Sequence, residues 1–222
     1  SAASELTFAI FVLLVLLAYI TYRETKREKF FWLTLAFYFA AMLSKEVAAL
    51  VVPAIVVCLD ALFFKKVRDM FLARELKRYV LFVLPVLVYA LMRLAVLGSF
   101  LGLERRGDFF GQLAIADRVY YFFWLFAFYL KSLFLPLHIS FLKEIPQNPD
   151  LMSLQFLLAA AVFIFFFAFL YGALRMGKKV VVLGFAWFFV FIFPVLIFYP
   201  ASSGVFFAKR YVLLSGIGFA LC

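Results

Sequence analysis

The chain has 222 residues, of which 68% are hydrophobic and 15% are charged, and its mean hydropathy is +1.11. Soluble domains contain about 45–50% apolar and about 25% charged residues, so this composition excludes a soluble globular domain and favours a helical membrane protein. The formal net charge is +10. Because the basic residues cluster between apolar runs, they are typical of cytoplasmic loops, and nucleic acid is not an expected partner.

At about 20 residues for each membrane helix, the chain has room for seven or eight membrane segments. The expected segments are the apolar runs at residues 6–22, 30–43, 47–64, 79–97, 119–137, 151–174, 180–199 and from 211 onward. The predicted fold class is therefore an all-α, polytopic transmembrane helical bundle, with residues 1–222 as a single transmembrane domain. The basic segment 65–78 is predicted to be an interfacial helix, and 98–118 a polar loop. Gly216 and Gly218 are expected to allow close helix packing.

The chain begins at Ser1 without a Met and stops at Cys222 inside an apolar run. We therefore expect a fragment of a longer protein, cut at both ends. No secretory signal pattern is visible. The two cysteines, Cys58 and Cys222, have no metal-binding spacing and are predicted to be packing residues.

The distribution of basic residues predicts an orientation in the membrane. Segments 23–29 and 65–78 hold four and six Lys and Arg residues, so both are expected on the cytoplasmic side. Strict alternation would then place the basic turn 175–179 outside, against the rule. The conflict disappears if 119–137 forms a broken or re-entrant element, which its Lys131 and Pro136 favour over a plain crossing.

Charges inside or beside apolar runs mark either ion pairs or functional groups. Lys45 and Glu46 are interpreted either as a helix-end pair that satisfies itself or as a site for an anionic lipid headgroup, in which Glu46 orients Lys45. Arg93 is about one turn from the outer end of its run, where it would either snorkel or bind phosphate. Asp60 is predicted to be a cap or a partner of one of the two lysines at positions 65 and 66.

Two further boundary positions are candidates. His138 is the only histidine and follows a proline at an expected helix end. Lys209 and Arg210 precede the last apolar run, where basic anchors are common in any membrane protein. The sequence contains no zinc spacing, phosphate-binding glycine loop or nucleophile elbow.

Four groups of residues, taken in order, resemble one family. They are the opening 1–6; Ser44-Lys45-Glu46 with Pro53 and Leu59-Asp60; Tyr129-Leu130 with 135–140; and 184–188 with Pro194, 208–211 and Gly218-Phe219. Together they span nearly the whole chain. The chain is similar to the tetratricopeptide-repeat, TMTC-like O-mannosyltransferase group of the GT-C superfamily of membrane glycosyltransferases.

The chain also departs from that family. Lys209 stands where the family usually has Glu, and the first span, its external loop and the repeat tail are missing. That loop carries the acidic residues that the superfamily uses for metal binding or as the catalytic base. The resemblance therefore implies that the catalytic residue lies outside this chain, which itself holds no metal or cofactor; a divalent metal would bind through the absent loop.

The resemblance implies a transferase that takes a sugar of mannose type from a polyprenyl-phosphate donor. The acceptor would be a protein or a glycan on the extracytoplasmic side, and the location the bacterial inner membrane or the endoplasmic reticulum. Membrane lipid and partner membrane subunits are further expected contacts. The residues expected to hold the donor phosphate are Lys45, Glu46, Arg93, His138, Lys209 and Arg210.

Two other functions remain open. The chain is alternatively a non-catalytic membrane subunit, or a lipid-binding scaffold of a membrane complex, in which every charge is a structural anchor. A transporter is a third interpretation, although no inverted repeat is visible in the sequence.

Overall fold

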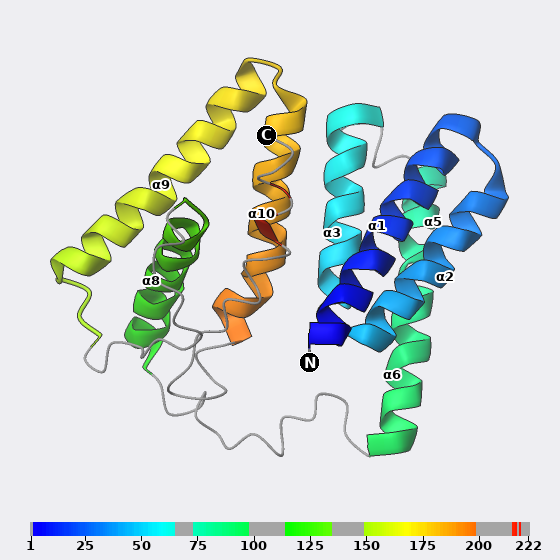
Figure 1. Cartoon of the computed structure of the whole chain (residues 1–222), viewed down its shortest axis with the longest axis horizontal. Helices are drawn as coiled ribbons and strands as arrows, with labels where there is room; N and C mark the ends of the chain where they lie inside the picture. The colour runs from blue at the N-terminus through cyan, green and yellow to red at the C-terminus, as the bar shows by residue number, and fades with distance from the viewer. Residues whose placement is uncertain are drawn as a thin grey trace. The chain divides into compact units, whose positions relative to one another are not determined.

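The computed structural model describes residues 2–64, 73–97, 114–134, 149–198, 215, 216 and 218 (Figure 1). Across these residues the structure consists of helices and short turns, without a β-strand, which confirms the predicted all-α class. The chain divides into two compact units, Ser1–Glu104 and Arg105–Cys222. Each unit is described by itself.

The first unit contains two long helices that form an antiparallel hairpin, α1 (Ala2–Thr25) and α2 (Glu28–Ser44). Three further elements follow, namely α3 (Ala48–Leu59) with its π-helical continuation η1 (Asp60–Phe64), α5 (Ala73–Leu81) and α6 (Val83–Leu97). Lys26 ends α1 in the left-handed conformation, with φ of 57°. Its amide donates to the Tyr22 carbonyl at 2.8 Å, so the chain reverses within a few residues.

Buried residues along α1 and α2 follow a repeat of alternating three and four positions. This repeat averages 3.5 residues and gives each helix a single seam, as in a coiled coil. The α1 seam is Glu5, Phe8, Val12, Val15, Tyr19 and Tyr22, and the α2 seam includes Phe31, Leu35, Tyr38 and Met42. One step beyond each end of the α2 seam stand the charged residues Glu28 and Lys45.

Pro85 explains the boundary between α5 and α6. Proline has no amide hydrogen, so the helical bond that position 85 would make to the carbonyl of Leu81 is lost. The helix is interrupted by a turn at Phe82 and resumes at Val83. The Phe82 ring is buried against the rings of Tyr19, Phe31 and Tyr38, which fixes the interrupted helix to the α1–α2 hairpin.

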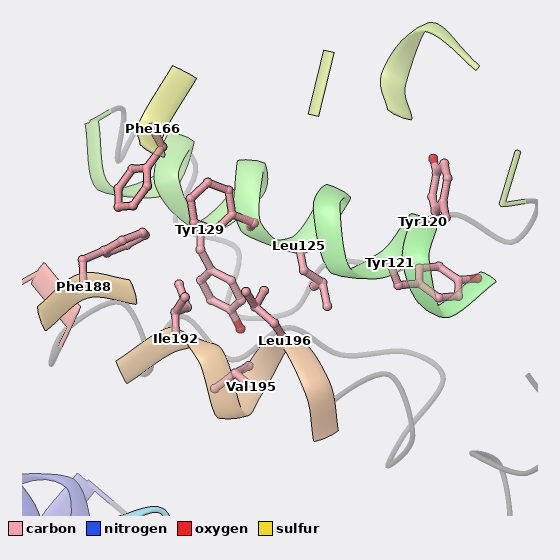
Figure 2. Packing of buried hydrophobic residues seen from close by; sticks show 10 residues of the cluster. Tyr120, Tyr121, Leu125, Tyr129, Phe166, Phe188, Ile192, Val195 and Leu196 are labelled. Atoms are coloured by element: carbon pink, nitrogen blue, oxygen red, sulfur yellow. The ribbon is translucent and has the colours of Figure 1, made fainter. Parts of the chain in front are cut away.

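The second unit contains α8 (Ile115–Phe134), α9 (Leu154–Arg175) and α10 (Lys179–Phe198). Its core is largely aromatic, and Figure 2 shows the Tyr129 side chain of α8 beside Ile192 and Leu196 of α10. Edge-to-face ring pairs, such as Phe126–Phe166 with centroids 5.1 Å apart, allow many rings to pack densely.

The ring pairs also fix the directions of these helices. Along α8 and α9, Tyr120 stacks on Phe156, whereas Phe126 lies against Phe166, so both numbers rise together and the two helices run parallel. Between α9 and α10 the numbers run in opposite senses, from Phe163–Phe189 to Phe169–Phe185. The α9–α10 pair is therefore antiparallel.

A tight turn joins α9 to α10. Gly177 has φ of 69°, and its amide donates to the carbonyl of Leu174 at 3.1 Å, while the Lys178 amide donates to that of Ala173 at 3.0 Å. This pair of hydrogen bonds is the Schellman arrangement, in which glycine is favoured because it has no Cβ. The turn ends one apolar helix and begins the next after three residues.

The glycines near the chain end behave partly as predicted. A Cβ at Gly218 would lie 2.5 Å from the Gly184 carbonyl oxygen and 2.9 Å from the Trp187 side chain, so only glycine fits against α10. A Cβ at Gly216 would lie 3.3 Å from Leu133, which is a looser approach. Close packing is confirmed for Gly218.

Four helices in the described ranges are long and apolar enough to cross a membrane: Ser4–Thr25, Leu76–Val96, Leu154–Arg175 and Lys179–Ile197. The outer faces of α6 and α9 carry exposed large apolar side chains, among them Leu84, Leu87, Leu91, Leu157, Leu158, Ile164 and Phe165. Surfaces of this kind are stable in contact with lipid rather than water. The predicted total of seven to eight segments stays a prediction.

One predicted boundary is wrong. Residues 115–118 belong to the first turn of α8 and not to the predicted loop 98–118, whose residues 98–113 lie outside the described part. The helix α8 is continuous through residue 134, so 119–134 contain no break, and the re-entrant alternative for 119–137 stays a prediction. The Lys131 side chain is exposed, and Pro136 lies beyond the described end.

Candidate functional site

Two ion pairs lie at one end of the first unit, where α1 begins, α2 meets α3, and α6 approaches its last turn. The Lys45 ammonium pairs with the Glu5 carboxylate, and the Arg93 guanidinium pairs with the Glu46 carboxylate. The hydroxyl of Tyr89, one turn earlier on α6, accepts a further hydrogen bond from Arg93 Nη1 at 3.3 Å. Three segments of the chain, namely α1, the link between α2 and α3, and α6, thus contribute charges to this end.

The link between α2 and α3 explains why neighbouring residues reach different partners. Lys45 is extended, with φ of −154° and ψ of 128°, and its amide still donates to the Ala41 carbonyl. The next helical turn begins at once, because the amides of Ala48 and Ala49 donate to the carbonyls of Lys45 and Glu46. Successive side chains of an extended segment point in opposite directions, which separates Lys45 from Glu46.

Lys45 reaches Glu5 because both stand on the helical seams. Glu5 is three residues before Phe8 on the α1 seam, and Lys45 is three residues after Met42 on the α2 seam. The two helices are antiparallel, so these positions meet at the end of the seam. The Lys45 ammonium also lies 5.9 Å from the Phe8 ring centroid, within the range of a cation–π contact.

These contacts correct part of the sequence interpretation. Glu46 was expected either to form a self-contained pair with Lys45 or to orient it, but its observed ion-pair partner is Arg93. The physical reason is the extended geometry at Lys45. Arg93 lies four residues before the end of α6 at Leu97, and the structure brings Lys45, Glu46 and Arg93 to one end of the unit.

The two ion pairs differ in burial. In the Glu5–Lys45 pair the side chains are 9% and 18% exposed, whereas in the Glu46–Arg93 pair Glu46 is 63% and Arg93 is 15% exposed. A buried pair is costly to break because one charge is left without compensation in a poorly solvated place. An exposed pair contributes little, so its partner can be exchanged.

The remaining three predicted site residues, His138, Lys209 and Arg210, lie outside the described residues. Their expected convergence with Lys45 and Arg93 therefore stays a prediction. Among the residues that the structure does describe, no three His, Cys, Asp or Glu side chains are grouped closely enough to hold a metal ion.

A second charged cluster lies at the opposite end of the first unit. The Asp60 carboxylate pairs with Arg23 Nε at 2.9 Å, and the hydroxyls of Tyr19 and Tyr79 both donate to Asp60 Oδ2. The Arg23 and Asp60 side chains are 3% and 0% exposed. This network connects α1, η1 and α5.

Sequence reasoning identified Asp60 but proposed the lysines at 65 and 66 as partners, both of which lie outside the described residues. Arg23 was counted only as a loop charge. It follows Tyr22, a buried residue of the α1 seam, and is itself buried. A more exposed pair, Arg78–Glu28 at 3.2 Å, lies at the same end.

No protein-family model, curated protein or solved structure matches this chain.

Proposed function

We propose that this chain is the membrane part of a GT-C-like glycosyltransferase that uses a polyprenyl-phosphate-linked sugar, of mannose type, as its donor. The bundle would have seven to eight membrane segments, and the acceptor, a protein or a glycan, would lie on the extracytoplasmic side. The observation that carries the proposal is the gathering of Lys45, Glu46 and Arg93 at one end of an apolar helical unit.

The chemistry of the donor matches this arrangement. A polyprenyl chain requires a lipid-exposed apolar surface, which the outer face of α6 offers. The phosphate requires a cation at the membrane boundary, and a guanidinium fork matches phosphate oxygens in geometry. Arg93 stands four residues before the end of α6 at Leu97, where an apolar face and a cation meet.

The described residues at this end do not supply the acid–base step of sugar transfer. Transfer of a sugar to a hydroxyl acceptor requires a base that removes the acceptor proton. The described carboxylates at this end, Glu5 and Glu46, are both held in ion pairs with cations. We assign the catalytic base to neither of them.

The proposal is tested by donor turnover in membranes that contain the protein. Release of polyprenyl phosphate from a radiolabelled polyprenyl-phosphate mannose is compared for the unchanged protein, Arg93→Gln and Arg78→Gln. Arg78 is the matched control, because its partner Glu28 is 61% exposed and it lies at the opposite end. We expect turnover to fall at least about tenfold for Arg93→Gln, which corresponds to about 1.4 kcal/mol, and to persist for Arg78→Gln. Equal turnover in all three proteins would contradict the proposal.

A second candidate is a non-catalytic, lipid-binding membrane subunit. It is favoured by the observation that Lys45, Arg93, Arg23 and Arg78 are each held by a carboxylate, as structural anchors would be. Binding of polyprenyl phosphate at Arg93 without turnover of the sugar-bearing donor would favour this candidate.

A further inference from the structure

The two ion pairs at the Arg93 end have the same charges but different surroundings. Glu5 and Lys45 meet at the end of the α1–α2 seam and are largely covered. Glu46 projects from the short link between α2 and α3, and most of its side chain is exposed, although the guanidinium that it holds is mostly covered. A ligand arriving from outside therefore meets the Glu46 carboxylate first.

We infer that the Glu46–Arg93 pair is an exchangeable latch on a phosphate site, whereas the Glu5–Lys45 pair is a fixed structural strut. Glu46 occupies the guanidinium of Arg93 while the site is empty, and a phosphate group of an entering ligand takes its place. This inference rests on the proposed function and deepens it, because it names Arg93, and not Lys45, as the cation that binds the phosphate.

Energetics favour exchange at Arg93. A carboxylate as exposed as Glu46 gains only about 0–1 kcal/mol from its ion pair, since water solvates it nearly as well. A phosphate carries more negative charge and accepts the two parallel hydrogen bonds that a guanidinium offers. Displacement of Glu5 from Lys45 would instead leave a carboxylate without a counter-charge in a covered position, at a cost of several kcal/mol.

The surroundings of Arg93 indicate a ligand with an apolar tail. Val96 lies three residues after Arg93 along α6, so the two are neighbours on the helix surface. Met92 directly precedes Arg93 in the sequence. Both apolar side chains are exposed, and Val96 is among the most exposed in the unit. Tyr89 holds the guanidinium from the preceding turn. A phosphate at Arg93 would thus have lipid-facing residues beside it.

Binding of polyprenyl phosphate to the purified full chain, measured by native mass spectrometry in detergent, tests the latch. Removal of a competing charge worth up to about 1 kcal/mol predicts that Glu46→Gln tightens binding about two- to fivefold. We expect Arg93→Gln to weaken binding at least tenfold and Arg78→Gln to leave it unchanged. The double variant Glu5→Gln/Lys45→Gln, which removes both charges of the strut together, is expected to weaken it by no more than about twofold.

Two results would overturn the latch. One is a Glu46→Gln protein that binds polyprenyl phosphate no more tightly than the unchanged protein. The other is a Glu5→Gln/Lys45→Gln protein, folded by circular dichroism, that loses as much affinity as Arg93→Gln, because Lys45 would then be the phosphate ligand.

Parallel titrations with inorganic phosphate and with phosphatidylglycerol vesicles identify the source of the phosphate. A Glu46→Gln effect that extends to inorganic phosphate supports a latch that recognises the phosphate group alone, and an effect confined to the lipids supports a lipid-borne phosphate. The latch and the proposed function fail separately. If Glu46→Gln binds polyprenyl phosphate more tightly but the unchanged protein does not turn over the donor, the latch stands and the transferase is rejected. If the unchanged protein turns over the donor but Glu46→Gln binds polyprenyl phosphate with unchanged affinity, the transferase stands and the latch is rejected.

Discussion

The Tyr38 hydroxyl donates a 3.0 Å hydrogen bond to the backbone carbonyl of Ala49. Ala49 stands four residues before Pro53, which lies inside α3 and has no amide hydrogen to donate to that carbonyl. The buried Tyr38 side chain of α2 therefore replaces the hydrogen bond that the proline removes. In an apolar environment such replacement is required, since water is not available to the carbonyl.

The Tyr38→Phe change is predicted to destabilise the fold by about 1–3 kcal/mol, because it leaves the Ala49 carbonyl without this donor. The same change in a Pro53→Ala background is predicted to cost less, since the restored amide at position 53 then donates to Ala49. Unfolding by denaturing detergent in mixed micelles measures both free energies. Equal costs of Tyr38→Phe in the two backgrounds would contradict this account.

The buried Arg23–Asp60 pair is predicted to be a major contributor to stability. Asp60→Asn removes the charge that compensates Arg23 and weakens the acceptor of two tyrosine hydroxyls, so we expect a loss of about 3–5 kcal/mol. Arg23→Gln combined with Asp60→Asn is expected to recover part of this loss. The same unfolding measurement gives both values.

The exposed Arg78–Glu28 pair at the same end serves as the control. Glu28→Gln is predicted to change the free energy of unfolding by less than about 1 kcal/mol, since exposed pairs contribute little. A comparable loss for Glu28→Gln and Asp60→Asn would show that burial does not decide the energetics of this cluster.

Sequence reasoning singled out charges that the structure shows in ion pairs, but it did not name Glu5 or Arg23 as their partners. Lys45, Arg93 and Asp60 were identified because charges beside apolar runs are unusual. The partners depend on which helices meet, and Glu5 and Arg23 are 40 and 37 positions away from Lys45 and Asp60. Proximity in sequence favoured Glu46 and the lysines near 65 instead.

Hydropathy predicted most helix boundaries closely, but it did not predict the relative directions of the helices that pack together. Apolar periodicity identifies a buried face and carries no information on which partner helix covers it or in what direction. The parallel packing of α8 on α9 became visible only from ring pairs such as Phe126–Phe166. The π-helical turn Asp60–Phe64 had no sequence signal either.

Two glycines in neighbouring turns of the chain are predicted to respond with opposite signs to alanine. Neither Gly172 nor Gly177 has an atom within 4 Å of a Cβ position, so packing does not distinguish them. Gly172→Ala is expected to stabilise α9 by about 0.5–1 kcal/mol through helix propensity. Gly177→Ala is expected to destabilise by about 1–2 kcal/mol, because its φ of 69° is strained for alanine. Thermal unfolding in detergent compares the two variants.

The parallel direction of α8 and α9 removes the conflict in the predicted orientation. If both helices cross the membrane, the residues that precede α8 and those that precede α9 face the same side, and the basic turn 175–179 faces the other. That turn is then predicted to be cytoplasmic, as 23–29 is.

Single cysteines at Lys26, Lys178 and Asp150, in a Cys58→Ala/Cys222→Ser background, test this orientation. In sealed vesicles of known orientation, an impermeant maleimide is expected to label positions 26 and 178 from the cytoplasmic side and position 150 from the opposite side. Labelling of 26 and 178 from opposite sides would contradict the predicted orientation.

The central claim is that the Arg93 end of the first unit binds a lipid phosphate. The most direct test is photocrosslinking of the protein in membranes with a polyprenyl phosphate whose reactive group is close to the phosphate, followed by peptide mapping. The account predicts adducts on the link that carries Glu46 and on the part of α6 around Arg93, and their loss in Arg93→Gln. Adducts confined to the Arg23–Asp60 end, or unchanged by Arg93→Gln, would contradict it.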